Sequence, residues 1–215
     1  MGTERKRTVS SGVCQFCDAQ VAKTAIARHL KACEKRPAGQ EGRFHLVVEG
    51  RGAPEFWLHL DASGKATLAH LDGFLRSTWL ECCGHLSAFT IEGTEYESNP
   101  EPGSRGMRPA LEKVLASGMK FRYVYDYGSS TELTLRVLGD SNAPKNEDRV
   151  RLLARSVLPD YQCECGAKAT KIYTECMWSG QALYCDACLE DDDCGEEMAL
   201  PIVNSPRAGV CGYTG

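Results

Sequence analysis

Cysteine is the residue whose distribution most constrains this chain. The 215-residue sequence holds 12 cysteines, of which three lie within residues 14–33, two are adjacent at positions 82 and 83, and seven lie within residues 163–211. Short paired spacings without an apolar leader are typical of zinc ligands in a reducing compartment rather than of disulfides. We therefore expect zinc-folded modules at both ends of the chain and place the protein in the cytoplasm.

The N-terminal cluster reads VCQFCDAQVAKTAIARHLKAC. Its first two cysteines form a CxxC pair, and its His and last Cys lie four residues apart, on one face of a helix that we expect to begin near Lys23. Val21 and Ile26 would fill the small core. Closed sets of four Cys and His ligands are structural zinc sites. The spacing predicts a C2HC zinc finger in residues 1–40, with the ligands Cys14, Cys17, His29 and Cys33.

The helix of this finger is poorly suited to reading a DNA sequence. Fingers that read DNA use helix positions −1, 3 and 6, which correspond here to Ala22, Ala25 and Arg28. Alanine cannot form bidentate hydrogen bonds with base edges. Residues 1–36 nevertheless carry eight Lys/Arg against three acids, a net charge of +5. We favour a small folded module for protein contact, with non-specific phosphate contacts as the alternative, made by Arg5, Lys6, Arg7, Lys23, Arg28, Lys31, Lys35 and Arg36.

The C-terminal cluster combines a CxC pair with a CxxC pair. The span between the two pairs is that of a zinc ribbon, and the layout is loosely similar to B-box interaction modules. The spacing predicts a second zinc ion, bound by Cys163, Cys165, Cys185 and Cys188. Cys176 and Cys194 remain, either as ligands of a further zinc ion or as free or buried thiols. We therefore expect two zinc ions, or three if this last pair also binds one.

Two other groups of cysteines lack the usual ligand spacing. Cys82, Cys83 and His85 could form a third metal site, but adjacent cysteines seldom ligate one zinc ion together, so we favour the interpretation of partly buried residues near a helix end. Cys211 lies between glycines in the C-terminal segment LPIVNSPRAGVCGYTG, whose apolar residues indicate that it is pinned to a surface. We interpret Cys211 as a buried or weakly exposed thiol.

The middle of the chain, residues 42–158, alternates strand and helix signals. Strands are expected in FHLVVEG, FWLHLD, LSAFTIEGTEYES, KFRYVYDYGSSTELTLRVLGD and DRVRLLARSVL. Helices are expected in MRPALEKVLAS and in GKATLAHLDGFLRSTWL, where one face is apolar: Leu68, Leu71, Leu75 and Trp79. The sequence predicts an α+β fold with a central, mainly antiparallel sheet and two helices, flanked by two small zinc modules, the second at residues 160–215.

The segment WLECCGHLSAFTIEGTEYE, followed by a helix and by YVYDYGSSTELTLRV, resembles the plasmid pRiA4b ORF-3-like domain, a family also described among passenger proteins of an insertion element. The family often continues Asp-x-Trp-x-His after its Tyr-Asp-Phe-Gly motif, whereas this chain has Ser129, Thr131 and Leu133 there. The resemblance covers roughly residues 42–157 and implies an α+β fold but little chemistry. The matching residues are Trp79, His85, Leu86, Phe89, Tyr125, Asp126, Tyr127 and Gly128.

Two functional hypotheses remain. The sequence has no P-loop, dinucleotide-binding glycine motif, zinc-protease motif or Gly-x-Ser-x-Gly, and its apolar runs are far shorter than the ~20 residues of a membrane helix. In the first hypothesis the protein is a non-catalytic, zinc-binding adaptor with a protein partner, a nucleic-acid partner bound without sequence specificity, or both. In the second it is an enzyme that uses His85 and Asp126 as acid and base near Trp79 and Tyr127.

Overall fold

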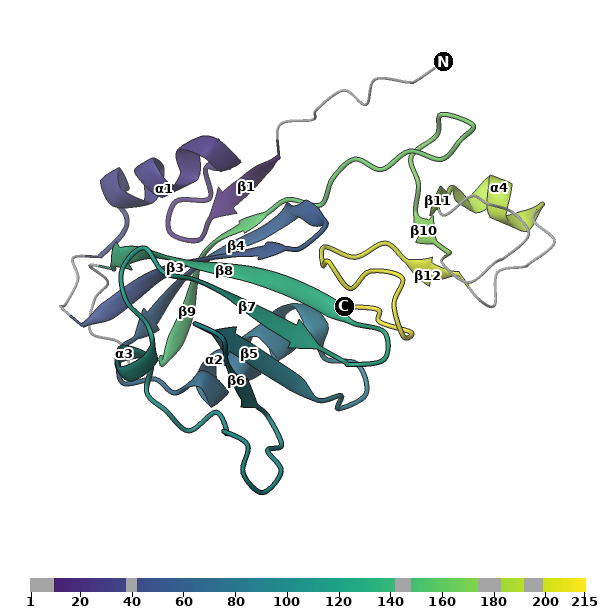
Figure 1. The fold of residues 1–215 in the computed structure, drawn as a ribbon. Coiled ribbons are helices and arrows are strands. Elements are labelled where there is room, and N and C mark those ends of the chain that lie inside the picture. The colour runs from purple at the N-terminus through teal and green to yellow at the C-terminus, as the bar shows by residue number, and fades with distance from the viewer. Residues whose placement is uncertain (1–9, 38–41, 142–147, 174–182, 192–198) are drawn as a thin grey trace, which may run out of the picture.

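Figure 1 shows the computed structural model, which describes residues 10–37, 42–141, 148–173, 183–191 and 199–215. Within these residues, nine strands form one antiparallel sheet in the order β2-β1-β9-β4-β3-β8-β7-β5-β6. The predicted α+β class with a mainly antiparallel sheet is confirmed. The strands are β1 (Ser11–Cys14), β2 (Gln20–Ala22), β3 (Arg43–Gly50), β4 (Ala53–Ser63), β5 (Ser87–Ile91), β6 (Thr94–Glu97), β7 (Lys120–Tyr125), β8 (Thr131–Asp140) and β9 (Val150–Ser156).

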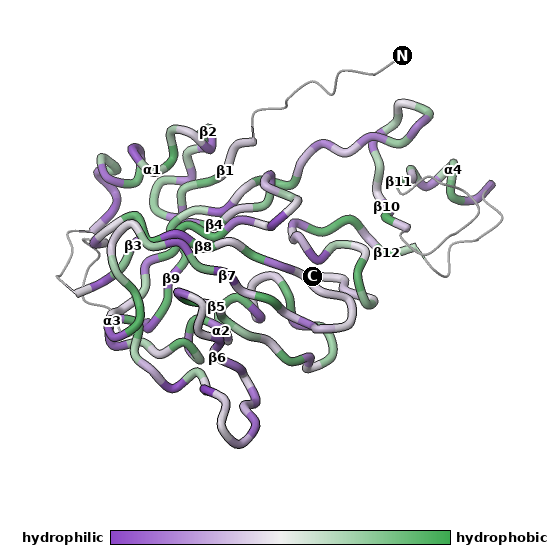
Figure 2. Tube along the Cα trace, in the orientation of Figure 1, coloured by the Kyte–Doolittle hydropathy of each residue, from purple (hydrophilic) through white to green (hydrophobic). Residues whose placement is uncertain are grey.

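One face of the sheet is covered by α2 (Leu68–Leu75) and by η1 (Arg76–Leu80), a π-helical turn that continues it. Thr67 caps α2, since its side chain accepts a hydrogen bond from the backbone N–H of His70 at 3.3 Å. The predicted apolar face of this helix is fully buried against alternate residues of the central strands. In Figure 2 hydrophobic and hydrophilic stretches are interspersed along the strands of the sheet.

The second predicted helix is shorter than its sequence suggested. Only α3 (Leu111–Val114) is helical, because the backbone just before it and at its start bonds to the segment before and at the start of α2. The backbone N–H of Leu111 donates to the carbonyl of Ala66 at 2.7 Å, and the N–H of Leu68 donates to the carbonyl of Pro109 at 3.1 Å. These pairings use backbone groups that a longer helix would need for itself.

The N-terminal finger is continuous with the central sheet. Its strand β1 pairs with β9, with Cys14 opposite Ala154, and β2 adds to the outer side of β1. Its helix α1 (Lys23–Ala32) lies over the other face of the sheet, where Ile26 and Leu30 are fully buried against Trp57. Of the small core that we predicted, Ile26 is buried and Val21 is only partly buried.

A pair of buried histidines lies on this second face, on β3 and β4. His45 and His59 are 3 % and 4 % exposed, and His45 Nε2 lies 2.8 Å from His59 Nδ1. The pKa of His45 is lowered to about 4 and that of His59 to about 3, and burial is the largest cause for both rings. Nearby cations, such as Arg36 and Lys23, lower these pKa values further. Both rings are therefore neutral in the folded protein near neutral pH.

The C-terminal module has its own small sheet. β10 (Lys171–Ile172) pairs with β11 (Leu183–Tyr184) and with β12 (Leu200–Pro201), and α4 (Asp186–Glu190) follows β11. In Figure 1 the yellow C-terminal segment leaves β12 and returns to the central sheet. None of the helices in the described part of the chain has the length and apolar character of a membrane span.

The histidine pair predicts an acid-dependent loss of stability. The unfolded chain takes up protons below its ordinary His pKa of about 6.5, whereas the folded pair does not, so unfolding becomes easier as the pH falls from 6.5 towards 4. Each histidine changes the unfolding free energy by up to about 1.4 kcal/mol per pH unit in this range. We expect the double substitution His45→Leu/His59→Leu to flatten the dependence of the unfolding free energy on pH, measured by denaturant titration. The exposed His70 supplies the control, His70→Gln, which should keep the wild-type slope; equal slopes in the double variant and the wild type would contradict the prediction.

Candidate metal centres

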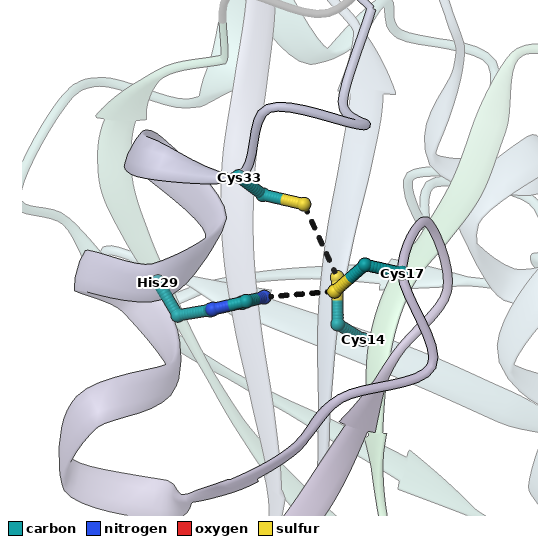
Figure 3. A group of neighbouring side chains, drawn as sticks. All are labelled: Cys14, Cys17, His29 and Cys33. Atoms are coloured by element: carbon teal, nitrogen blue, oxygen red, sulfur yellow. Dashed lines mark hydrogen bonds between the residues drawn. The ribbon is translucent and has the colours of Figure 1, made fainter.

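The four predicted ligands of the N-terminal finger converge on one point (Figure 3). Cys14 Sγ lies 4.0 Å from Cys33 Sγ, and Cys17 Sγ lies 3.3 Å from His29 Nε2. All four ligand atoms are within 4.8 Å of one another. A zinc tetrahedron with bonds of about 2.0 to 2.3 Å has edges of roughly 3.3 to 3.8 Å. This group could therefore bind a metal ion with little rearrangement.

Local backbone geometry places these ligands. After β1 the chain forms a knuckle in which the N–H of Asp18 donates to the carbonyl of Cys14 at 3.0 Å, and Asp18 has a left-handed φ of 60°. His29 lies in the last turn of α1, and Cys33 is its C-terminal cap residue. The backbone N–H of Ala19 lowers the pKa of the Cys17 thiol, which favours the thiolate form that binds metal.

The C-terminal ligands converge in the same way. Cys163, Cys165, Cys185 and Cys188 have their sulfur atoms within 4.8 Å of one another, with 3.6 Å between those of Cys165 and Cys185. The CxC pair lies in a tight turn in which the N–H of Gly166 donates to the carbonyl of Cys163 at 2.9 Å, and Gly166 has a φ of 87°. Cys185 precedes α4 and Cys188 lies within it. This group could also bind a metal ion.

The four thiols of the C-terminal group can all ionise together only when a cation is bound. The backbone N–H groups of Cys165 and then of Cys185 lower the pKa of the Cys163 thiol to about 6. The largest cause that raises the pKa of the Cys188 thiol is its side-chain hydrogen bond with Cys165. Four thiolates at these separations repel one another, so only a bound cation lets all of them ionise together.

The structure adds a fourth side chain to the possible third site at Cys82, Cys83 and His85. Cys82, Cys83 and His85 meet Cys211, and their ligand atoms also lie within 4.8 Å of one another. The alternative in which Cys82, Cys83 and His85 belong to a metal site therefore gains a fourth candidate ligand, and Cys211, which we interpreted as a buried or weakly exposed thiol, is exposed. Local spacing gave no signal, because His85 and Cys211 are 126 positions apart. Cys176 and Cys194, our candidates for a further zinc site, lie outside the described residues.

The predicted phosphate-contact residues have different surroundings. Lys23 pairs with Glu49 at 3.0 Å and donates to the carbonyl of Pro54 at 2.5 Å. Arg36 is also engaged, since it donates to the carbonyl of Leu30 and to Ser141 Oγ, both at 2.9 Å. Arg5, Lys6 and Arg7 lie outside the described residues. The exposed members are Arg28, Lys31 and Lys35.

The two residues of the enzyme hypothesis are close together. Asp126 Oδ2 lies 3.6 Å from His85 Nε2 and accepts a hydrogen bond from Arg207 Nη2 at 2.8 Å. Burial opposes ionisation of Asp126, but Arg207 and the backbone N–H of Gly128 outweigh it and lower the pKa of this carboxyl. A carboxylate held ionised in this way is a poor general acid. A hollow of about 220 Å³ nearby is lined by Leu86 but by neither His85 nor Asp126.

Comparisons with known proteins give no family. No family model matches the chain, and no curated protein matches it. One similar solved structure is that of MM3350, a protein of unknown function from Methanosarcina mazei Go1. The two proteins are 16% identical with a TM-score of 0.44, and the match covers 52% of this chain and 67% of that chain. A similarity at this level carries no argument about function, so the function of the present chain is inferred from its own residues.

The finger cluster predicts a metal-dependent helix. Isolated helices shorter than about 12 residues are marginal in water, so α1, with 10 residues, depends on the metal and on its contact with the sheet. We expect Cys17→Ser to remove one equivalent of zinc and to raise amide hydrogen exchange throughout α1. The matched control is Cys188→Ser, which should also lose one equivalent but leave exchange in α1 unchanged. Retention of the full zinc content by Cys17→Ser would refute the assignment.

Proposed function

We propose that this chain is a zinc-binding, non-catalytic interaction protein. One observation carries the proposal: each of the two predicted clusters supplies four Cys or His ligand atoms within 4.8 Å of one another. Catalytic zinc sites have three protein ligands and leave a position for water or substrate, whereas closed sets of four are structural. The metal in these clusters would fold small modules rather than perform chemistry. A reducing compartment such as the cytoplasm would keep the thiols available as ligands.

We further propose that the central region is related to the pRiA4b ORF-3-like domain. The proposal is supported by the arrangement of the matching residues around one corner of the fold. Trp79, Phe89 and Tyr125 are fully buried, Asp126 is 5 % exposed, and the half-buried His85 lies 3.6 Å from Asp126.

The partner that the geometry favours is a phosphate backbone. On the sheet face beside α1, Lys120 of β7 lies directly opposite Arg136 of β8, and Arg122 lies two residues further along β7. All three side chains are exposed, and within the described residues none of them has an ion pair. Like charges that face each other across strands are destabilising without a counterion. An anion bound here would remove that repulsion.

The same cluster borders a hollow. A space of about 200 Å³ is lined by Val47, Glu49, Lys120, Thr134 and Arg136. Glu49 is partly neutralised there by Lys23 of α1. The finger therefore adjoins this basic face and could add its own exposed cations to a track for phosphates. Such contacts position a nucleic acid without reading its sequence, which agrees with the alanines at the readout positions of α1.

The enzyme hypothesis has one observation in its favour, the 3.6 Å separation of His85 and Asp126. We retain the non-catalytic proposal because the same His85 Nε2 lies 3.3 Å from Cys211 Sγ, within a set of metal-ligand candidates. Asp126 is in turn occupied by the buried side chain of Arg207.

A salt titration tests the nucleic-acid proposal. We expect a fluorescent duplex of mixed sequence to bind the full-length protein with an affinity that falls linearly with salt on logarithmic axes. Lys120→Gln/Arg136→Gln should lower the magnitude of this slope by roughly two, because each lost phosphate contact contributes about 0.9. The exposed pair Arg108→Gln/Lys113→Gln removes the same charge elsewhere and should leave the slope unchanged. Absence of binding at low salt, or equal effects of both pairs, would favour a protein partner instead.

A further inference from the structure

The third Cys/His group is assembled from two distant parts of the chain. Cys82, Cys83 and His85 follow η1, whereas Cys211 comes from the C-terminal tail. His85 Nε2 lies 3.3 Å from Cys211 Sγ, the same distance as that between Cys17 Sγ and His29 Nε2 in the finger. The set is also of the same kind as that of the finger, with three sulfur ligands and one imidazole nitrogen. The two groups therefore match in both composition and spacing.

Burial does not explain why these side chains meet. Free cysteines that act as small apolar residues are among the most buried residues in proteins. Cys83 and Cys211 are instead exposed, and Cys82 and His85 are only partly buried. Four potential ligands thus face one another at the surface, where solvation would let them separate freely. A shared ligand accounts for their convergence.

The tail is brought to this place mainly by contacts of Ser205 and Arg207 with the central domain, and Arg207 Nη2 also donates to Cys82 Sγ at 3.4 Å. The side chain of Arg207 is fully buried and forms an ion pair with Asp126 at 2.8 Å, and its Nη1 donates to Thr131 Oγ1 at 3.0 Å. Ser205 Oγ donates to the carbonyl of Trp79 at 2.6 Å. These contacts preorganise the tail, so that a ligand at position 211 is presented to the loop at 82–85.

The backbone at Cys211 is also unusual. Its φ is 51°, in the left-handed region that non-glycine residues seldom occupy. The next residue, Gly212, has a φ of 66° as well. Such conformations carry a cost and persist where the surrounding structure or a function requires them. At this position the turn directs Cys211 Sγ towards His85.

We propose that Cys82, Cys83, His85 and Cys211 form a third zinc site, which fastens the C-terminal tail to the central sheet. Three thiolates and one imidazole in a tetrahedron select zinc among the common divalent ions. Since the ligands come from both segments, zinc binds fully only when the tail is docked, and bound zinc in turn stabilises the docked tail. We call this third site, with its ligands Cys82, Cys83, His85 and Cys211, the latch. Its formation does not depend on which partner the sheet binds.

The three sites should release zinc in a defined order. The finger has one buried ligand, Cys14, and the C-terminal module has two, Cys163 and Cys185, whereas none of the four ligands of the third site is buried. A chelator therefore reaches the third site most easily. The first equivalent of zinc removed by limited chelator should come from the latch, and the tail should become accessible at the same step.

Zinc content and hydrogen exchange of the full-length protein, prepared with reductant and zinc, test the proposal. The wild type should hold one equivalent for each of the three groups, and Cys211→Ser should hold one fewer. Amides of the tail that are bonded in the docked form, such as those of Val210 and Tyr213, should exchange at least about tenfold faster in this variant, since structural zinc contributes directly to the stability of the segment that it holds.

Two further variants keep the test decisive. Cys83→Ser changes an exposed side chain outside the tail, so it should fold normally, lose one equivalent of zinc and still release the tail. Cys17→Ser, the finger variant, should lose one equivalent without altering exchange in the tail. The latch is refuted if wild type and Cys211→Ser hold equal amounts of zinc, or if Cys83→Ser leaves the tail as protected as in the wild type. Nucleic-acid binding plays no part in these readouts, so the outcome is independent of the proposed partner.

Discussion

Trp57 is the residue through which the zinc finger and the central sheet support each other. Its indole is fully buried, and the backbone of β1 approaches it so closely that a Cβ on Gly12 would lie 2.3 Å from the ring. Its Nε1 donates to Ser10 Oγ at 2.8 Å, and its backbone N–H donates to Ser156 Oγ at 3.1 Å. One side chain thus contacts the finger strand, the finger helix and β9, and only glycine fits opposite it.

Metal ligation would compensate for the small size of the terminal modules. Among the described residues of the C-terminal module, the buried apolar cluster consists of Tyr173, Tyr184 and Leu189, with Cys188 and Ala199 packed against it. A core of this size buries too little apolar surface to offset the loss of chain entropy, and small folds of this kind depend on metals or cross-links. The finger is also small, but its buried apolar residues share one core with residues of the central sheet.

The sequence predicted those features that depend on neighbouring residues. Cys14 and Cys33 are 19 positions apart, and Cys165 and Cys185 are 20 apart, so local spacing was enough to group them. Period-two alternation likewise indicated the strands, and the burial of Leu68, Leu71, Leu75 and Trp79 followed from helical periodicity. These signals require no knowledge of how distant segments meet.

The features that the sequence did not predict all arise from long-range contacts. Pairing of β1 with β9 joins segments more than a hundred residues apart, and no local pattern marks it. The shortness of α3 follows from backbone bonds to the segment around Ala66. The third cluster depends on Arg207, a single charged residue in an irregular segment whose partner, Asp126, lies 81 positions away. Apolar residues had suggested that the tail is pinned, but buried polar contacts hold it.

The place of β2 at the end of the strand order has a consequence for solubility. A sheet edge exposes unpaired backbone groups, and a long edge strand invites pairing with another chain. Without the finger, the edge would be β9, which has seven residues and apolar side chains such as Leu152 and Leu153. The finger replaces it with β2, a strand of only three residues. A metal bound by the finger would therefore also protect the sheet from strand addition between molecules, because unfolding of the finger would leave β9 as the edge strand.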